Sequence, residues 1–375
     1  MDGIFALGSN GSGQLGIHHK DDVSVPKQVE FVGEAPESDI VHIAAGGNHT
    51  VLLTEAGKAY WAGDPSSGAC GIVDNTDKEV EISKFHELII STPKSAGFIR
   101  HVACTWDSTV LVLEDENSGV TLVYTCGIAD VGASSTNSES STAKLPTLVE
   151  DFPPPEIKVK SISAGFRHVV VVLDNGDVYG WGNGRKGQLG ELNDTADSKG
   201  VIHQPKKISG VPFKVAQAVC CQYTTCLIGE PGDGRILVLG ADKWGLKSSA
   251  PAEIPNWNTI SASWGGIYVL QRNGTLVAWG RDDHGQLPPP GLPELESIAA
   301  GSEHIVALTK DGDVLSWGWG EHGNCGPQTE KFGDVKGRWN VLASLKNLPE
   351  GPKITAIGAG CATSWINIAT DGLFL

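Results

Sequence analysis

The chain is 375 residues long and acidic, with a formal net charge of −16, and 48 of its residues are glycine. Binding to nucleic acid or to anionic lipid depends on a basic surface, so direct DNA binding and membrane association are not expected. The sequence has no secretory-type N-terminal segment and no apolar run long enough to span a bilayer. It therefore predicts a soluble, intracellular protein.

Short strands that end in glycine recur along the chain at intervals of a few tens of residues. The first covers residues 5–8 (FALG). Six more follow at 60–63, 124–127, 179–182, 237–240, 277–280 and 315–318. A period of this length is typical of repeat architectures, so each local motif has to be interpreted by its position in the repeat.

A turn of small residues recurs equally often, and we call its copies the first turns. They lie at 45–49, 103–107, 164–168, 220–224, 262–266, 300–304 and 359–363. The most complete repeat spans 159–190, where a first turn leads into the β-branched strand 169–173. An Asn-Gly hairpin then returns the chain through 178–181, and the glycine-rich turn 182–187 reverses it again. The repeat is thus predicted to be a four-stranded antiparallel meander.

Each end of the chain holds only part of a repeat. The chain starts in the middle of a unit and finishes with a first turn and a strand at 364–369. Together the two ends complete one unit, so the strand 4–7 is expected beside the C-terminal strands. The predicted fold is all-β: one domain over 1–375, a seven-bladed β-propeller of four-stranded antiparallel blades, closed by pairing the N-terminal and C-terminal strands in one blade. Such a ring leaves no long exposed strand edge.

Three regions depart from the regular repeat. Residues 129–156 are rich in Ser, Thr and Pro and are predicted to form a flexible insertion. A short helix is expected at 84–90, within a longer linker. The blades built on the first turns at 220–224 and 262–266 are the most degenerate, and the proline-rich stretch 287–293 is predicted to replace an outgoing strand with a stiff linker.

The glycine-rich motifs do not indicate an enzyme. Three GxGxxG matches, at 11–16, 182–187 and 318–323, fall at one position of the repeat where glycines turn a hairpin. A dinucleotide site needs this pattern between a strand and a helix, and no helix is expected after any of them. We therefore predict a protein without catalytic activity and without a cofactor.

The cysteines and the repeated histidines are interpreted as structural. The eight cysteines include no CxxC pair, so buried free thiols are expected and no metal site is predicted. His49, His168 and His304 share one position of the repeat. We predict that each forms a hydrogen bond that holds its first turn against the next strand.

One side of the propeller carries unusual turn residues. The first and third hairpins of every meander lie on this side, which we call the hairpin face. Its turns include several large aromatic residues, which are typical of recognition surfaces. The alternative is that these rings fold inward over the central channel and pack on one another. The predicted partner-binding residues are Trp106, Asp107, Trp264, Glu303, Trp319, Glu321, His322 and Asn324.

The combination of AGxxH turns, DG hairpins and the segment WGNGRKGQLG at 181–190 resembles the regulator-of-chromosome-condensation repeat family, whose fold is a seven-bladed propeller. The resemblance covers essentially the whole chain. Several stretches are more similar to the fungal alpha-tubulin suppressor branch of that family, also known for killer-toxin insensitivity. They are 5–10, 46–53, 106–110, 301–304, 317–328 and 360–365. The run 317–328 (WGWGEHGNCGPQ) departs from the generic repeat and is the most specific of them.

The resemblance to this branch implies a non-enzymatic interaction scaffold of the cytoplasm and nucleus. The implied partner is a small CSL-type zinc-finger electron carrier, bound as a heterodimer by a chain that is monomeric when alone. The implied role is support of Elongator-dependent modification of wobble uridines in tRNA, which the chain contacts only indirectly, and of diphthamide synthesis. The alternative is a guanine-nucleotide exchange factor for a small GTPase, as in the chromosomal member of the family, although no segment is recognisable as the displacing loop that exchange needs.

Overall fold

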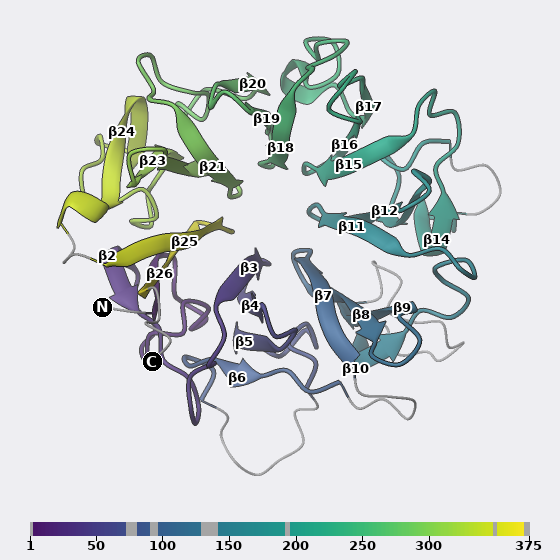
Figure 1. Ribbon diagram of the computed structural model, residues 1–375, viewed down its shortest axis with the longest axis horizontal. Coiled ribbons are helices and arrows are strands. Elements are labelled where there is room, and N and C mark those ends of the chain that lie inside the picture. Colours follow the sequence, from purple (N-terminus) through teal and green to yellow (C-terminus); the bar gives the residue numbers. More distant parts are fainter. Residues whose placement is uncertain are drawn as a thin grey trace.

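The computed structural model describes residues 3–72, 81–90, 97–128, 142–191, 196–347 and 351–370. Seven antiparallel sheets stand radially around a central axis (Figure 1). We number the corresponding blades 1 to 7 from the sheet that begins with β3, so that β1 and β2 belong to blade 7. The all-β, seven-bladed propeller predicted from the sequence is confirmed.

Blades 1 to 3 each contain four strands in sequential order. Blade 1 consists of β3 (Ile40–Ala45), β4 (His49–Thr54), β5 (Ala59–Gly63) and β6 (His86–Glu87). Blade 2 consists of β7 (Gly97–Cys104), β8 (Ser108–Asp115), β9 (Thr121–Ile128) and β10 (Thr142–Leu148). Blade 3 consists of β11 (Val159–Ala164), β12 (His168–Leu173), β13 (Val178–Asn183) and β14 (Val201–Lys207).

Blades 4 and 5 have three strands, so the prediction of four strands in every blade is wrong for these two. Blade 4 consists of β15 (Val215–Cys220), β16 (Thr224–Gly229) and β17 (Ile236–Gly240), followed by the 3₁₀ turn η3 (Lys243–Gly245). Blade 5 consists of β18 (Trp257–Ala262), β19 (Gly266–Gln271) and β20 (Leu276–Gly280). Prolines follow both third strands, at 251 and 255 and at 288–290 and 293. Proline has no backbone N–H to donate to a sheet, and the predicted replacement of the outgoing strand at 287–293 is confirmed.

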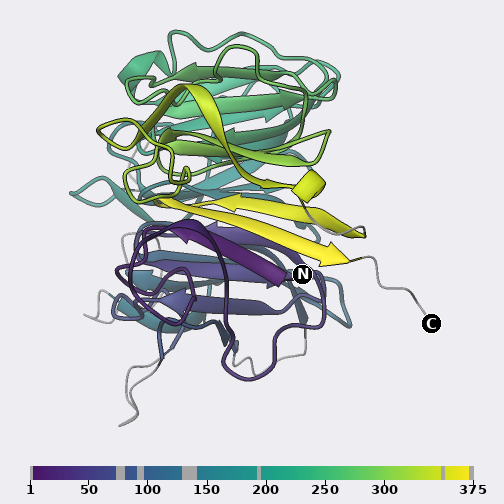
Figure 2. The same ribbon diagram turned by 90° about the vertical axis from the view of Figure 1, so that its left-hand side faces the viewer.

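Blades 6 and 7 complete the ring. Blade 6 consists of β21 (Leu295–Ala300), β22 (His304–Thr309), β23 (Asp313–Trp319) and β24 (Asp334–Ser344), with the 3₁₀ turn η4 (Leu345–Asn347) after it. Blade 7 combines β25 (Pro352–Ala359) and β26 (Thr363–Thr370) with β1 (Gly3–Gly8) and β2 (Val23–Gln28). β1 lies beside β26 (Figure 2). In this pairing Ile4 lies opposite Asn367 and Ala6 opposite Trp365. The predicted closure of the ring by its two ends is confirmed.

Two local predictions need correction. The helix expected at 84–90 is a turn followed by β6, because the backbone of Phe85 bonds to another segment instead of to its own turn: its N–H donates to Glu30 O at 2.8 Å, and its carbonyl accepts from Val32 N at 2.8 Å. The insertion predicted at 129–156 lies outside the described residues up to 141. From residue 142 the chain forms β10, and Phe152 is buried 6.0 Å from Trp181, measured between ring centroids.

The second strand of a typical blade is buried along its whole length. Every residue of β4, β12, β16 and β22 is buried. Because each blade is covered by a neighbour on both faces, these strands are nearly continuous apolar runs instead of alternating ones. Four tryptophans are also fully buried: Trp61, Trp181 and Trp317 on third strands, and Trp365 on the second strand of blade 7.

The repeated histidines form hydrogen bonds, as predicted, and the strand that each one contacts belongs to the neighbouring blade. His49 Nε2 lies 2.9 Å from Thr109 Oγ1, and His168 Nε2 lies 3.0 Å from Thr225 Oγ1. His304 Nε2 lies 2.9 Å from Ser364 Oγ. Burial lowers the pKa of each of these imidazoles to about 4, so all three are neutral at physiological pH.

Candidate partner-binding face

The hairpin face brings the predicted partner-binding residues together at one end of the sheets. In a meander the strands alternate in direction, so the turn from first to second strand and the turn from third to fourth lie at the same end. The first turns line the axis, and the third-hairpin turns form the outer part of the face. Seven of the eight predicted residues lie in these two kinds of turn, and Trp319 is the last residue of β23, where the third-hairpin turn of blade 6 begins.

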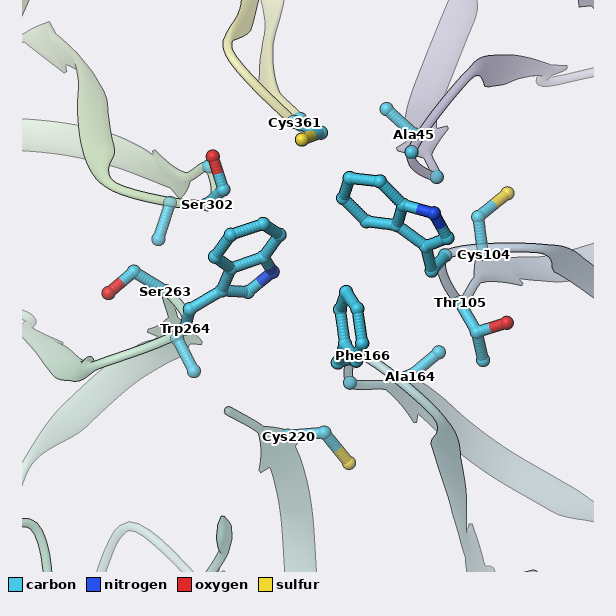
Figure 3. A pocket seen from close by; sticks show the side chains of 18 of the residues that line it. Ala45, Cys104, Thr105, Ala164, Phe166, Cys220, Ser263, Trp264, Ser302 and Cys361 are labelled. Atoms are coloured by element: carbon cyan, nitrogen blue, oxygen red, sulfur yellow. The ribbon is translucent and has the colours of Figure 1, made fainter. Parts of the chain in front are cut away.

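An aromatic cluster from three blades occupies the centre of the hairpin face. Phe166 of blade 3 and Trp264 of blade 5 point toward one another over the axis (Figure 3). Trp106 of blade 2 contacts both rings. Their ring centroids are 5.1 Å apart for Trp106 and Phe166, 5.7 Å for Trp106 and Trp264, and 5.6 Å for Phe166 and Trp264. They line a small cavity of about 100 Å³. Trp106 and Trp264 therefore adopt the alternative arrangement, in which the rings pack on one another over the channel, although each stays partly exposed.

Backbone hydrogen bonds between blades fix the turns that carry this cluster. Trp106 donates its N–H to Phe166 O at 3.0 Å and accepts from Gly47 N at 3.0 Å. Trp264 donates to Ser302 O at 2.9 Å and accepts from Gln222 N at 3.0 Å. The two tryptophans are thus part of the contacts that join the blades, whatever else they bind.

A second aromatic group lies in the third-hairpin turn of blade 6. Trp319 is partly exposed and contacts His322 edge-on, with 5.3 Å between ring centroids. His322 Nδ1 lies 2.8 Å from Asp22 Oδ2 of blade 7. Trp319 is not among the residues that line the central cavity. It therefore does not plug the channel, and Glu321 beside it is exposed.

Two of the predicted residues are buried within the fold. Asn324 has no exposed surface, and its Nδ2 donates to Trp319 O at 2.8 Å. Glu303 is 7% exposed, and its carboxylate accepts from Arg281 Nη1 at 2.7 Å and from Gln286 Nε2 at 2.9 Å. These two side chains support the turns of the hairpin face from the interior, and almost none of their own surface is accessible to a partner.

The remaining predicted residue, Asp107, belongs to an ion pair across blades 2 and 3. Its Oδ2 lies 3.6 Å from Arg167 Nη2, and both side chains are partly exposed. Sequence reasoning missed Arg167 and the comparable cation Arg281, which also bonds both oxygens of Asp283 at 2.6 and 2.8 Å. The Arg281 guanidinium lowers the pKa of Asp283 to about 2. The RDD triplet at 281–283 was the available signal.

A further aromatic residue that was missed is Trp244 in η3. It has a positive φ of 58°, and Lys243 Nζ lies 3.9 Å from the centroid of its ring. Arg281 Cζ lies 5.0 Å from the same ring. An added Cβ at Gly265 would lie 3.0 Å from this ring, a tight contact that favours glycine there. The tetrapeptide DKWG at 242–245 was the sequence signal for this residue. It lies in a blade that the sequence indicates only as a degenerate repeat.

The described residues offer little reactive chemistry. Within them no group of His, Cys, Asp and Glu side chains is arranged to hold a metal ion. All eight cysteines are free and at least partly buried, and burial raises the pKa of the thiols of Cys104, Cys126, Cys220 and Cys325 to about 12. Such thiols are poor nucleophiles because the thiolate is the reactive form. No described helix has the length and apolar character needed to cross a bilayer.

Sequence comparisons match the chain to propellers of one kind. The RCC1-like domain family matches residues 3–366. An RCC1 repeat-containing protein of Schizosaccharomyces pombe is 32% identical over 293 residues, which cover 76% of this chain and 78% of that protein. The secretion-regulating guanine nucleotide exchange factor of Mus musculus is 27% identical over 309 residues, which cover 76% of this chain and 61% of that protein.

Solved structures show the same architecture. Prp20p from Saccharomyces cerevisiae, described with its binding to Gsp1p and histones, superposes with a TM-score of 0.79 at 19% identity and covers 99% of this chain and 92% of its own. Human WBSCR16 superposes with a TM-score of 0.76 at 17% identity, and each chain is fully covered. At these identities the likeness shows the fold alone.

Proposed function

Because the chain belongs to the RCC1-like domain family, we propose that it is a non-enzymatic scaffold whose hairpin face binds one small protein. The proposed partner is a CSL-type zinc-finger electron carrier, bound as a heterodimer in the cytoplasm and nucleus. Through this partner the chain would support Elongator-dependent wobble-uridine modification and diphthamide synthesis, with tRNA contacted only indirectly. The choice of partner rests on the sequence resemblance, above all on the run 317–328.

The observation that carries the binding role is the pair formed by Trp319 and His322. A second Trp-Gly adds nothing that the repeat needs, and the structure leaves Trp319 partly exposed and outside the central cluster. Large aromatic rings that are accessible before binding are frequent energetic centres of protein interfaces. We therefore expect Trp319 to be buried by the partner.

The turn around Trp319 is already ordered in the free chain. Asn324 Nδ2 holds Trp319 O at 2.8 Å, and Trp319 donates its own N–H to Glu303 O at 2.9 Å. A side chain presented by a fixed backbone loses less conformational entropy on binding than one on a loose loop. This rigidity supports recognition by the blade 6 turn.

The proposal is tested by Trp319→Ala in the full chain, titrated with the purified zinc-finger protein. Truncating a central aromatic anchor typically costs about 2 kcal/mol or more of binding free energy, so we expect a loss of affinity of at least about thirtyfold. The melting temperature should stay close to that of the unaltered chain. Ile89→Ala, at a 72% exposed apolar residue after β6 and away from the hairpin face, is the matched control and should bind normally. Unchanged affinity in Trp319→Ala would place the interface elsewhere.

The alternative function, nucleotide exchange on a small GTPase, is favoured by the name of the murine relative. It predicts that the chain accelerates release of bound guanine nucleotide from a GTPase. Affinity capture separates the two functions, because the scaffold role predicts a small cysteine-rich companion and exchange predicts a GTPase. Exchange assays on the captured GTPase would then decide whether the contact is catalytic.

A further inference from the structure

Two junctions between neighbouring blades share one backbone arrangement. In blade 5, Arg281 donates its N–H to Gly265 O at 2.8 Å, and in blade 3, Asn183 donates its N–H to Arg167 O at 2.8 Å. These equivalent bonds align the turn 281–286 with the turn 183–188 residue by residue. The junction of blades 5 and 6 can therefore be compared directly with that of blades 3 and 4.

The facing first turns align in the same way. Trp319 donates its N–H to Glu303 O at 2.9 Å in blade 6, and Ala241 donates its N–H to Tyr223 O at 3.0 Å in blade 4. Glu303 and Tyr223 are therefore equivalent residues on the two receiving blades.

At the junction of blades 5 and 6 a carboxylate of the chain itself occupies the space between the turns. Glu303 reaches across from blade 6, is held by Arg281 and Gln286 at 2.7 and 2.9 Å, and is 7% exposed. Gln286 is oriented for this role because its Oε1 accepts the N–H of His284 at 3.0 Å, which leaves its NH₂ group for the carboxylate. This junction is an internal example of carboxylate binding.

At the junction of blades 3 and 4 the same space is an open recess of about 350 Å³, which we call the blade 3–4 recess. Its lining consists of Phe166, Arg167, Asn183, Arg185, Lys186, Gln188, Gln222 and Tyr223. Gln188 is 1% exposed, and its Oε1 accepts the N–H of Lys186 at 2.9 Å, as the equivalent glutamine does in blade 5. Its NH₂ group is again the part left to donate. The equivalent of Glu303, however, is Tyr223, so the chain supplies no carboxylate.

The blade 3–4 recess is also the place where positive charge gathers on an otherwise acidic chain. Its lining has three cations and no Asp or Glu. Arg167 is anchored by Asp107 at 3.6 Å. Arg185 and Lys186 are exposed, and neither forms an ion pair with any residue in the described parts of the chain. A net charge of −16 repels polyanions in general, so this local potential favours a single anionic group.

We propose that the blade 3–4 recess binds a carboxylate of a protein partner, an Asp or Glu side chain, with Gln188 in the role that Gln286 has toward Glu303. Asn183 stands where blade 5 has Arg281, so the positive charge comes from other residues of the recess. Gln188 and the cations Arg185 and Lys186 donate to the carboxylate. The rings of Phe166 and Tyr223 pack against apolar atoms beside it. Charge-assisted hydrogen bonds of this kind are stronger than neutral ones. The site does not depend on which partner carries the carboxylate.

The test measures binding of a short Glu-rich peptide, with acetylated and amidated ends, to the full chain. Binding is measured by titration calorimetry at low salt. The same peptide with Gln in place of Glu is the probe control. We expect the Glu peptide to bind, to weaken as salt rises, and to bind at least about tenfold more tightly than the Gln peptide. Equal binding of the two peptides would overturn the proposal.

The decisive variant is Tyr223→Glu, because it supplies from blade 4 the carboxylate that Glu303 supplies from blade 6. It should lower the affinity for the Glu peptide by at least about tenfold, whereas Tyr223→Gln should not. It should also melt at a higher temperature than Tyr223→Gln, which shows that the new carboxylate occupies the recess. Equal peptide affinity in the two variants would refute the site.

Two further measurements test which side chains bind the peptide and which kind of anion the recess prefers. Arg185→Gln with Lys186→Gln changes exposed residues only and should abolish peptide binding without altering the melting temperature. Inorganic phosphate is the competing probe. If phosphate displaces the Glu peptide and binds more tightly than it does, the recess is a phosphate site and the assignment to a carboxylate is wrong.

Discussion

Trp106 and Trp319 both lie in turns of the hairpin face, but they have different neighbours. The ring of Trp106 contacts rings from two other blades, and its backbone bonds to both adjacent blades. The ring of Trp319 contacts His322 of its own turn. An aromatic residue in a first turn is thus shared among blades, whereas one in the third-hairpin turn of blade 6 remains accessible. The position within the repeat decides whether the ring packs against other blades or stays accessible.

The largest expected effect comes from opening the ring on which this comparison depends. Removing residues 1–8 deletes β1, which lies between β26 and β2. Two strand edges lose their hydrogen-bonding partner, so the shortened chain should unfold over a broad, low-temperature transition and associate with itself. Calorimetry and light scattering measure both effects. A transition like that of the full chain would show that β1 does not close the ring.

Acid should act next most strongly, through the histidines beside the inner turns. His49, His168 and His304 have pKa values lowered to about 4, against about 6.5 in the unfolded chain. The unfolded state therefore binds these protons first, and stability is complete above about pH 6.5 and falls as pH decreases toward 4. Each histidine contributes up to about 1.4 kcal/mol per pH unit.

Urea denaturation between pH 7 and about 5 measures this loss before most carboxylates are protonated. His168→Gln keeps a polar group near Thr225 but cannot take up the proton, so its unfolding free energy should depend less on pH than that of the unaltered chain. An unchanged pH dependence would mean that protonation of His168 does not limit stability.

A third test is Trp106→Ala, the counterpart of Trp319→Ala. It removes the contacts with Phe166 and Trp264 and should lower the free energy of unfolding by about 2 kcal/mol or more. Trp319→Ala should lower it by less than about 1 kcal/mol, because that ring packs on His322 of its own turn instead of on rings from other blades. Denaturant titration of both variants compares them directly. If the two variants lose equal free energy of unfolding, Trp106 at the centre of the hairpin face and Trp319 in its outer part do not differ in structural role.

The smallest effect is expected at the contact between His322 of the blade 6 turn and Asp22 of blade 7. Asp22→Asn keeps an oxygen that can accept from Asn10 N but removes the charge opposite His322. Both side chains of the pair are about two-fifths exposed, at 42% and 38%, and solvent-exposed pairs are worth less than about 1 kcal/mol. A loss of stability larger than this would show that the blade 6 turn is as structural as the centre of the face.

The sequence by itself determined the repeat, the number of blades and the way in which the ring closes. These features depend on local pattern: a strand ending in glycine, a first turn, and a buried strand such as 169–173 between blades. The role of His49, His168 and His304 was also predictable, because a residue type that recurs at one repeat position makes the same contact in each blade. The prolines of the stretch 287–293 likewise predicted the loss of the fourth strand in blade 5, although the same loss in blade 4 was not predicted.

Tertiary structure decided which turn residues meet across the blades. Trp106, Phe166 and Trp264 come together because the ring places three distant first turns around one axis. Their local sequence left open whether the rings pack on one another or face a partner. Tertiary structure likewise decided the contact of Glu303, whose carboxylate is hydrogen-bonded to Arg281 of the preceding blade. It also decided the place of Tyr223, which supplies no carboxylate and leaves the equivalent recess open. The local sequence pattern predicts the strands because most pairs of hydrogen-bonded strands are consecutive along the chain. Contacts across blades depend on the geometry of the closed ring, so they became visible only in three dimensions.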